Sequence, residues 1–87
     1  MACYNIMTLV VNNRVKNAPK LQEELTKSGC IIKMRLGLHE ASEDACSNDG
    51  LIILHVIGSK DEIAGLEEKL NALEGVVAKN NEVCVDW

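Results

Sequence analysis

The chain divides into two halves of similar order, each with the pattern strand, helix, strand, and this repetition limits the folds open to it. In the first half, the segment Leu21–Leu25 is followed by Gly29 and then by two isoleucines. In the second half, Leu66–Leu70 is followed by Gly75 and then by two valines. Leucines at this spacing share one helix face, and a glycine after the last of them is a common helix end. The predicted order is therefore β-α-β-β-α-β.

Strands are predicted where β-branched and apolar residues run together. These runs are Tyr4–Val11, Cys30–His39, Leu51–Ile57 and Val76–Val85. Residues 40–50 are acidic, end in glycine and are expected to form a loop.

The two helices have different start signals. The first is expected to begin at a cap formed by Asn17 or Ala18, with Pro19 in its first turn, and to stop at Gly29. For the second, Ser59 is followed three residues later by Glu62, the spacing of a capping box. Gly75 is the expected stop of that helix.

Two β-α-β units with right-handed crossovers give a four-stranded antiparallel sheet with both helices on one face. The predicted fold class is thus α+β, a ferredoxin-like βαββαβ sandwich. At 87 residues the chain is long enough for one domain, residues 1–87. Many unrelated functions share this fold, so function has to be argued from particular residues.

The alternation of apolar residues predicts which side of each strand faces the helices. In the second strand, the apolar set is expected under the helices and Ile31, Lys33 and Arg35 outside. That apolar set is Ile32, Met34, Leu36 and Leu38. In the third strand, Ile52, Leu54 and Val56 are the expected core set. The opposite set is Leu51, Ile53, His55 and Ile57.

That second set would leave an apolar patch on the uncovered side of the sheet. We therefore expect a homodimer or a larger even-numbered oligomer that buries Ile53 and Ile57.

Composition excludes several classes of partner. The net charge is −4 and aromatic residues make up 2% of the chain, which leaves neither a basic surface nor a stacking platform for nucleic acid. No apolar run is long enough to cross a membrane, and the N-terminus lacks a signal-peptide pattern. We expect a cytoplasmic protein without direct nucleic-acid or membrane contacts.

The four cysteines are spaced too widely for a C-x-x-C motif. Disulfides are disfavoured in the cytoplasm, and a buried cysteine behaves as a small apolar residue. Cys30 and Cys84 are therefore expected to be ordinary core or sheet residues, whereas Cys46 lies among loop-forming residues.

One central motif resembles a known family. It consists of Arg35–Glu40 (RLGLHE), then Cys46-Ser47, then Gly50–Leu54 (GLIIL), and it is followed by the L-x-x-L-x-G-V pattern that ends at Val76. These residues are similar to the ACT-like family of regulators of the iron-only hydrogenase system, which is itself similar to the ligand-binding domain of the nickel-responsive repressor. The resemblance implies an oligomeric regulatory or sensory domain. A DNA-binding segment is absent from this sequence, so a transcriptional role would need a protein partner.

A small-molecule effector is the leading hypothesis. ACT domains commonly bind their effectors near the loop between the first strand and the first helix, which here contains Asn12, Asn13, Arg14 and Asn17. Two asparagine amides, a guanidinium suited to carboxylates and the N–H groups of a helix start are the binding groups expected there, with His39 as a further candidate. An ordinary polar turn capped by asparagine is the simpler alternative. The glycine typical of amino-acid-binding ACT loops is missing, which disfavours an amino acid effector.

A metal effector is the alternative within the same class. His39, Cys46 and His55 carry nitrogen and sulfur ligands suited to nickel, zinc or iron. Oxygen ligands would come from Glu40, Glu43, Asp44 and Asp49. Their spacing is not diagnostic of a metal site, so metal ligands and cofactors are not assigned.

Two further functions compete with sensing. A catalytic role is disfavoured, because the Asn12–Val15 turn has no glycine to wrap an anion and no nucleophile pair is evident, so no catalytic residue is assigned. An interaction module that binds another protein without any ligand remains the main alternative.

Overall fold

The computed structural model describes residues 1–41 and 46–87, with side chains described outside Arg14 and residues 38–48. The strands and helices follow the predicted order. The elements are β1 (Ala2–Val11), α1 (Arg14–Lys27), the short 3₁₀ helix η1 (Gly29–Ile31), β2 (Ile32–Ala41), β3 (Cys46–Val56), α2 (Lys60–Asn71) and β4 (Val76–Val85).

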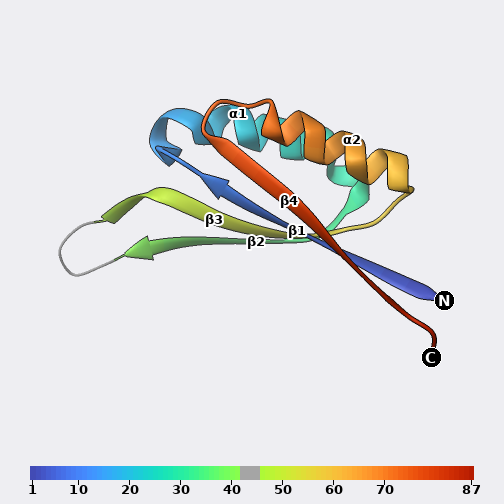
Figure 1. Ribbon diagram of the computed structural model, residues 1–87. Helices are drawn as coiled ribbons and strands as arrows, with labels where there is room; N and C mark the ends of the chain where they lie inside the picture. Colours follow the sequence, from blue (N-terminus) through green and yellow to red (C-terminus); the bar gives the residue numbers. More distant parts are fainter. Residues whose placement is uncertain (42–45) are drawn as a thin grey trace.

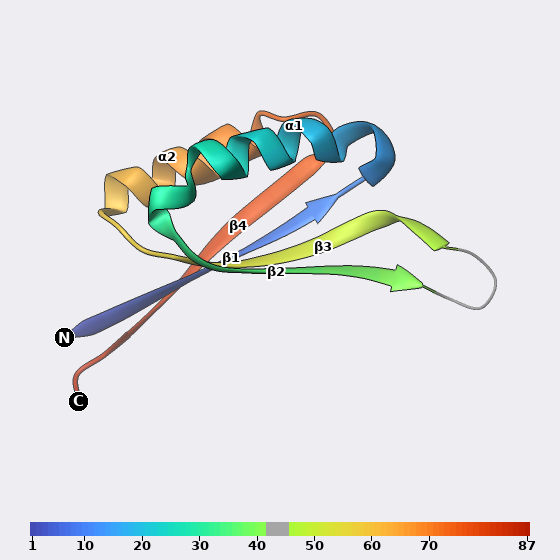
Figure 2. The same cartoon turned by 180° about the vertical axis from the view of Figure 1, so that it is seen from behind.

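The four strands form one antiparallel sheet in the order β2-β3-β1-β4. Both helices lie on the same face of this twisted sheet (Figures 1 and 2). The architecture is the ferredoxin-like βαββαβ sandwich that the sequence predicts. Neither of these helices covers the opposite side of the sheet, which we call the open face (Figures 1 and 2).

The core lies between the sheet and the helices. Its side chains alternate along the strands and recur at helical spacing in α1 and α2, as an amphipathic sandwich requires. They are Met7, Leu9, Val11, Leu21, Leu25, Ile52, Leu54, Val56, Ile63, Leu66, Leu70, Val76 and Ala78. The predicted core set of the third strand is therefore confirmed.

The face assignment of the second strand is wrong for Met34, Arg35 and Leu36, and the side chain of Leu38 lies outside the described residues. Ile32 pairs with Val56 on the helix side, but the register then shifts, so that Met34 pairs with His55. A one-residue irregularity reverses the face of every later side chain. Met34 and Leu36 consequently lie half-exposed on the open face.

Arg35 lies on the helix side for the same reason. Its guanidinium donates a hydrogen bond to the side-chain oxygen of Gln22 in α1. The position expected to face outward thus connects β2 to the helix layer.

Two other regions differ from expectation, and one helix start is confirmed. Helix α1 begins at Arg14 rather than near Asn17, so Pro19 lies inside the helix. Much of the predicted 40–50 loop is strand, because β2 and β3 remain paired out to Ala41 and Cys46. Helix α2 keeps its predicted start, since Ser59 and Glu62 form both hydrogen bonds of the capping box.

Cys84 is not an isolated sheet residue. It faces Cys3 across β1 and β4, and the two form a disulfide with Cα atoms 4.0 Å apart. Both cysteines are exposed. Cys30 is also exposed, in η1, so its predicted burial is wrong. Among the described helices, none is long and apolar enough to cross a membrane.

Candidate functional site

The β1–α1 turn is the first candidate site. Asn13 adopts a left-handed conformation (φ 49°, ψ 62°) that lets the chain reverse directly into α1, and asparagine tolerates this region better than most residues. The Asn13 carbonyl accepts hydrogen bonds from the N–H groups of Lys16 and Asn17, each at 3.0 Å. The Asn13 side chain makes no capping bond. The backbone thus starts the helix four residues earlier than the asparagine pattern predicts.

The turn is closed by its own polar groups. The Asn17 amide donates to the Asn12 carbonyl at 2.5 Å, and the Asn12 N–H donates to the Gly75 carbonyl at 2.7 Å. Gly75 ends the connection between α2 and β4. The β1–α1 turn and the α2–β4 connection therefore meet at this hydrogen bond. Of the amides predicted to bind an effector, Asn17 is already engaged within the turn.

A carboxylate lies next to this helix start. Asp49 Oδ1 accepts a hydrogen bond from the Asn13 N–H at 3.3 Å. Negative charge near a helix N-terminus is electrostatically favourable. An anionic effector at this turn would therefore have to compete with a carboxylate that the chain itself provides.

The sheet register brings His39 toward the same end of the molecule. His39 pairs with Gly50, Gly50 with Val11, and Val11 with Val76, so these four backbone positions form one row across the sheet. Neighbouring strands are about 4.8 Å apart, which places the His39 backbone roughly 10 Å from the end of β1. The side chains of Arg14 and His39 lie outside the described residues.

The backbone places His55 far from the other two candidate metal ligands, His39 and Cys46. His55 pairs with Ile6 and Met34 on the open face, five strand residues from Gly50. At about 3.4 Å per residue this is roughly 17 Å along β3 from the position paired with His39. Cys46 pairs with Ala41 still farther along the hairpin. Its side chain and those of Glu40, Glu43 and Asp44 lie outside the described residues.

A polar pocket that sequence reasoning missed lies between α2, β1 and β4. It has a volume of about 290 Å³. Its polar lining residues are Asn5, Lys60, Glu67, Asn80 and Glu82. Asn5, only 9% exposed, accepts a hydrogen bond from the Asn80 amide at 2.9 Å, and the Asn80 N–H donates to Glu67 at 2.5 Å. Asn80 Oδ1 is buried without a hydrogen-bond partner among the described residues.

The sequence contained a signal for this pocket. Asn5, Asn80 and Glu82 share the alternation of the core residues Met7 and Ala78, so polar groups occupy positions of the helix-facing side. A polar residue at a core-facing position needs hydrogen-bond partners, and here they come from neighbouring strands and from α2.

A second cleft, of about 400 Å³, separates the end of α1 from α2. Its lining includes the exposed Cys30 and charges of both signs, Lys27, Lys69, Asp61 and Glu62. Bonding within the Ser59–Glu62 capping box lowers the pKa of the Glu62 carboxyl below its ordinary value. This carboxylate therefore serves to start α2, and the cleft has no buried charge to fix a ligand.

Comparison with known proteins supports the fold. A structure of an uncharacterized protein from Thermotoga maritima matches with a TM-score of 0.78 and 26% identity, over 95% of this chain and 100% of that one. A putative PII-like signaling protein from Thermus thermophilus matches with a TM-score of 0.62 and 15% identity, over 97% and 90%.

CPII, a nitrogen regulatory PII-like protein from Thiomonas intermedia K12 bound to ADP, AMP and bicarbonate, matches with a TM-score of 0.53 and 15% identity, over 95% and 97%. At such identities the last two likenesses concern the fold alone. No protein-family model matches the chain, and no curated protein matches its sequence.

Proposed function

We propose that this protein is a small non-catalytic regulatory domain that self-associates through the open face of its sheet and responds to a small polar effector. The observation that carries the proposal is the number of apolar side chains on that face, which is interrupted by Thr8, His55, Lys79 and Asn81. Its apolar side chains come from all four strands. They are Tyr4, Ile6, Val10, Met34, Leu36, Leu51, Ile53, Val77 and Val83.

The open face has the size and character of a subunit interface. Four strands about 4.8 Å apart, each roughly ten residues long at about 3.3 Å per residue, give a surface of roughly 19 by 33 Å. Standard interfaces bury about 800 Å² of accessible surface per partner, which a side-chain-covered face of this size can supply. Isolated domains seldom expose such a patch. A second copy of the chain is the occupant we propose, because it offers the same apolar face in a two-fold arrangement.

The proposed effector site is the β1–α1 turn, formed by Asn12, Asn13, Arg14 and Asn17, with His39 at the same end of the sheet. Two observations support this site. The strand pairing puts His39, Gly50 and Val11 in one row, and the left-handed Asn13 turn follows directly after Val11. The PII-like CPII protein, which shares the fold, was solved with ADP, AMP and bicarbonate bound. Adenine nucleotides are therefore the first compounds to test. Control of an iron-only hydrogenase system is the role that the sequence resemblance adds, and the cytoplasm is the location that the sequence pattern favours.

Light scattering of the purified protein at micromolar concentration tests the assembly. We expect an even-numbered oligomer for the unmodified chain and folded monomers for Ile53→Glu, because the new carboxylate would be buried in the interface. Val15→Glu is the matched control, since Val15 is 78% exposed on α1 and away from the sheet. A monomeric wild-type protein would contradict the proposal.

Thermal-shift measurements distinguish the proposed sensor from the alternative function, a protein scaffold that binds no ligand. The probes are ADP, AMP, bicarbonate, Ni²⁺ and Zn²⁺, each tested against wild-type protein and Asn13→Ala. A bound ligand at about 100 times its Kd stabilises the native state by about 2.7 kcal/mol, an easily measured shift. Stabilisation that Asn13→Ala abolishes supports the effector site. No shift with any probe favours the scaffold.

A further inference from the structure

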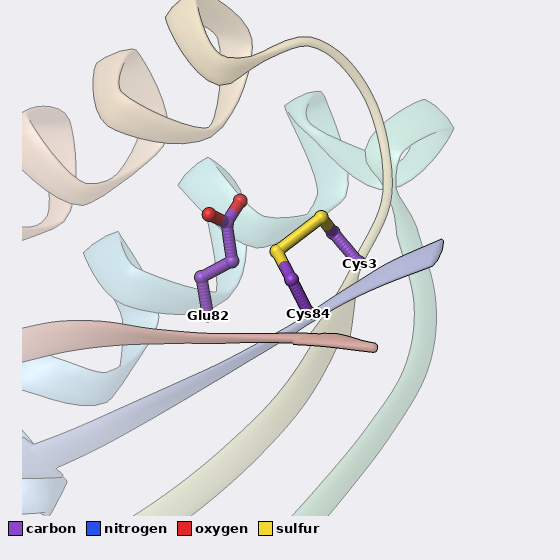
Figure 3. Close-up of side chains that lie close together, drawn as sticks. All are labelled: Cys3, Glu82 and Cys84. Carbon is purple, nitrogen blue, oxygen red and sulfur yellow. A yellow bond between two sulfur atoms is a disulfide. The ribbon is translucent and has the colours of Figure 1, made fainter. Parts of the chain in front are cut away.

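A sulfur- and oxygen-rich cluster lies at the end of the sheet that carries both termini. There β1 and β4 run past the helices as a two-stranded ribbon (Figures 1 and 2). Cys3 and Cys84 face each other across this ribbon, and Glu82 lies two residues before Cys84 on the same side of β4 (Figure 3). One ligand atom from each of the three side chains lies within 4.8 Å of the other two.

This set fits a thiophilic divalent cation. Zinc bonds to thiolates are about 2.3 Å long, so a tetrahedral ion holds two sulfur ligands about 3.8 Å apart. Two cysteines whose sulfurs reach bonding contact attain that separation by small side-chain rotations, without movement of the strands. The Glu82 carboxylate supplies a third ligand of a type that zinc accepts. All three side chains are exposed, so water can occupy the fourth position and the ion can exchange.

We propose that Cys3, Cys84 and Glu82 form a redox-gated site for a thiophilic divalent cation such as Zn²⁺. In the oxidised chain the two sulfurs are bonded to each other and cannot ligate. The S–S bond breaks and two thiols form when a reductant supplies two electrons and two protons. A dithiol gives both and becomes a disulfide, whereas a phosphine gives the electrons, takes the oxygen of a water molecule to become a phosphine oxide, and leaves that water's two protons on the sulfurs. The cation then binds both sulfurs as thiolates, and two protons are released.

The site is separate from the β1–α1 turn. That turn lies at the opposite end of β1, eight residues beyond Cys3 at its nearest point, Val11. At about 3.4 Å per residue this is roughly 27 Å. Failure of the effector proposal would therefore leave this proposal intact, and the reverse also holds.

Cobalt binding gives a direct test, because thiolate-bound Co²⁺ has a charge-transfer absorption that oxygen-bound Co²⁺ lacks. The parent protein is the Cys30→Ser, Cys46→Ser variant, in which Cys3 and Cys84 are the only thiols. After phosphine reduction we expect one Co²⁺ per chain with this band, displaced by Zn²⁺ but not by Mg²⁺. The oxidised parent should show no band.

Two variants of that parent identify the ligands. Cys84→Ser should abolish the band, and Glu82→Gln should weaken cobalt binding by roughly tenfold, an effect common even for outer-sphere partners of a metal. Both are compared with the parent in the reduced state, so loss of the disulfide does not confound the comparison. A band that persists in Cys84→Ser, or an affinity unchanged by Glu82→Gln, overturns the three-residue site.

A second measurement uses the unmodified chain and does not depend on the folding of any variant. The reduced protein is treated with iodoacetamide with and without Zn²⁺, and alkylation of each cysteine is read by peptide mass. Zn²⁺ should protect Cys3 and Cys84 and leave the exposed Cys30 reactive. Equal alkylation of Cys3 and Cys84 in the two samples would refute the proposal.

Discussion

Gly75 lies where the α2–β4 connection of the second half contacts the β1–α1 turn of the first half. Its φ of 74° lies in the left-handed region, and its carbonyl accepts the Asn12 N–H. A methyl group on Gly75 would collide with the Asn17 amide and lie 3.0 Å from the Asn12 carbonyl. The glycine therefore allows the α2–β4 connection to pack directly against the β1–α1 turn. It is not the helix stop that the sequence predicts, because α2 ends at Asn71 with Ala72 as its C-cap.

Gly75→Ala should lower the free energy of unfolding by about 1–3 kcal/mol, because a strained backbone and a displaced Asn17 side chain add to each other. Urea unfolding followed by circular dichroism measures the change. Gly29→Ala is the matched control, since no heavy atom lies within 4 Å of its added methyl group. An unchanged urea midpoint for Gly75→Ala would show that the turn adapts without cost.

At the scale of elements, the helices and strands differ in how far the sequence predicts them. The α2 capping box depends on residues three apart, and it forms as predicted. The start of α1 depends on a left-handed Asn13, which many turn asparagines do not adopt. The irregularity after Ile32 lies in the pairing of β2 with β3, where partners such as Ile32 and Val56 are distant from each other in the sequence. Local patterns therefore predicted the order of elements, while long-range pairing decided the faces of β2.

The hydrogen bonds of the Asn71 side chain are another feature that local sequence patterns do not predict. It donates to the Ala78 carbonyl at 2.9 Å and accepts the Ala78 N–H at 2.8 Å, which fastens the end of α2 to β4. The polar pocket beside it is likewise assembled from Asn5, Glu67 and Asn80, up to 75 positions apart. Strand alternation puts Asn5 and Asn80 on the helix-facing side, but short-range spacing does not show that they meet each other and Glu67 in one pocket.

The capping box also predicts a pH dependence. Bonding to Ser59 lowers the pKa of Glu62 in the folded state below its value in the unfolded chain. The stabilisation from this carboxylate is therefore present above the unfolded pKa of about 4.3 and is lost as the pH falls toward the folded pKa.

Thermal unfolding midpoints measured from neutral pH downward should fall less steeply for Glu62→Gln than for the wild-type protein. Glu68→Gln, on the same helix, is the control and should keep the wild-type slope. Parallel curves for wild-type and Glu62→Gln would argue against a stabilising role for this carboxylate.

At the scale of the whole molecule, the two ends of the chain are held together by the outer part of the sheet. β1 and β4 pair from Ala2↔Val85 to Val11↔Val76, and the ribbon near the termini extends beyond the helices (Figure 1). Core residues in β1 begin only at Met7, so the ribbon at Cys3 contributes little to core packing. Core packing does little to fix the two chain ends in place, so the disulfide is the covalent constraint that keeps them together.

The Cys3–Cys84 bond joins residues 81 positions apart, so an oxidised unfolded chain is nearly circular. Closing a loop of this length removes unfolded-state entropy worth up to about 4.5 kcal/mol, and measured effects are typically about 2–4 kcal/mol. Because the exposed ribbon has little core to disturb, reduction should leave the native fold intact and act mainly on the unfolded state.

We expect reduction by a phosphine, without added metal, to lower the free energy of unfolding by about 2–4 kcal/mol in urea titrations. Cys84→Ser should match the reduced wild-type protein and be insensitive to the phosphine. If oxidised and reduced wild-type protein unfold at the same urea concentration, the ends are already constrained by strand pairing alone.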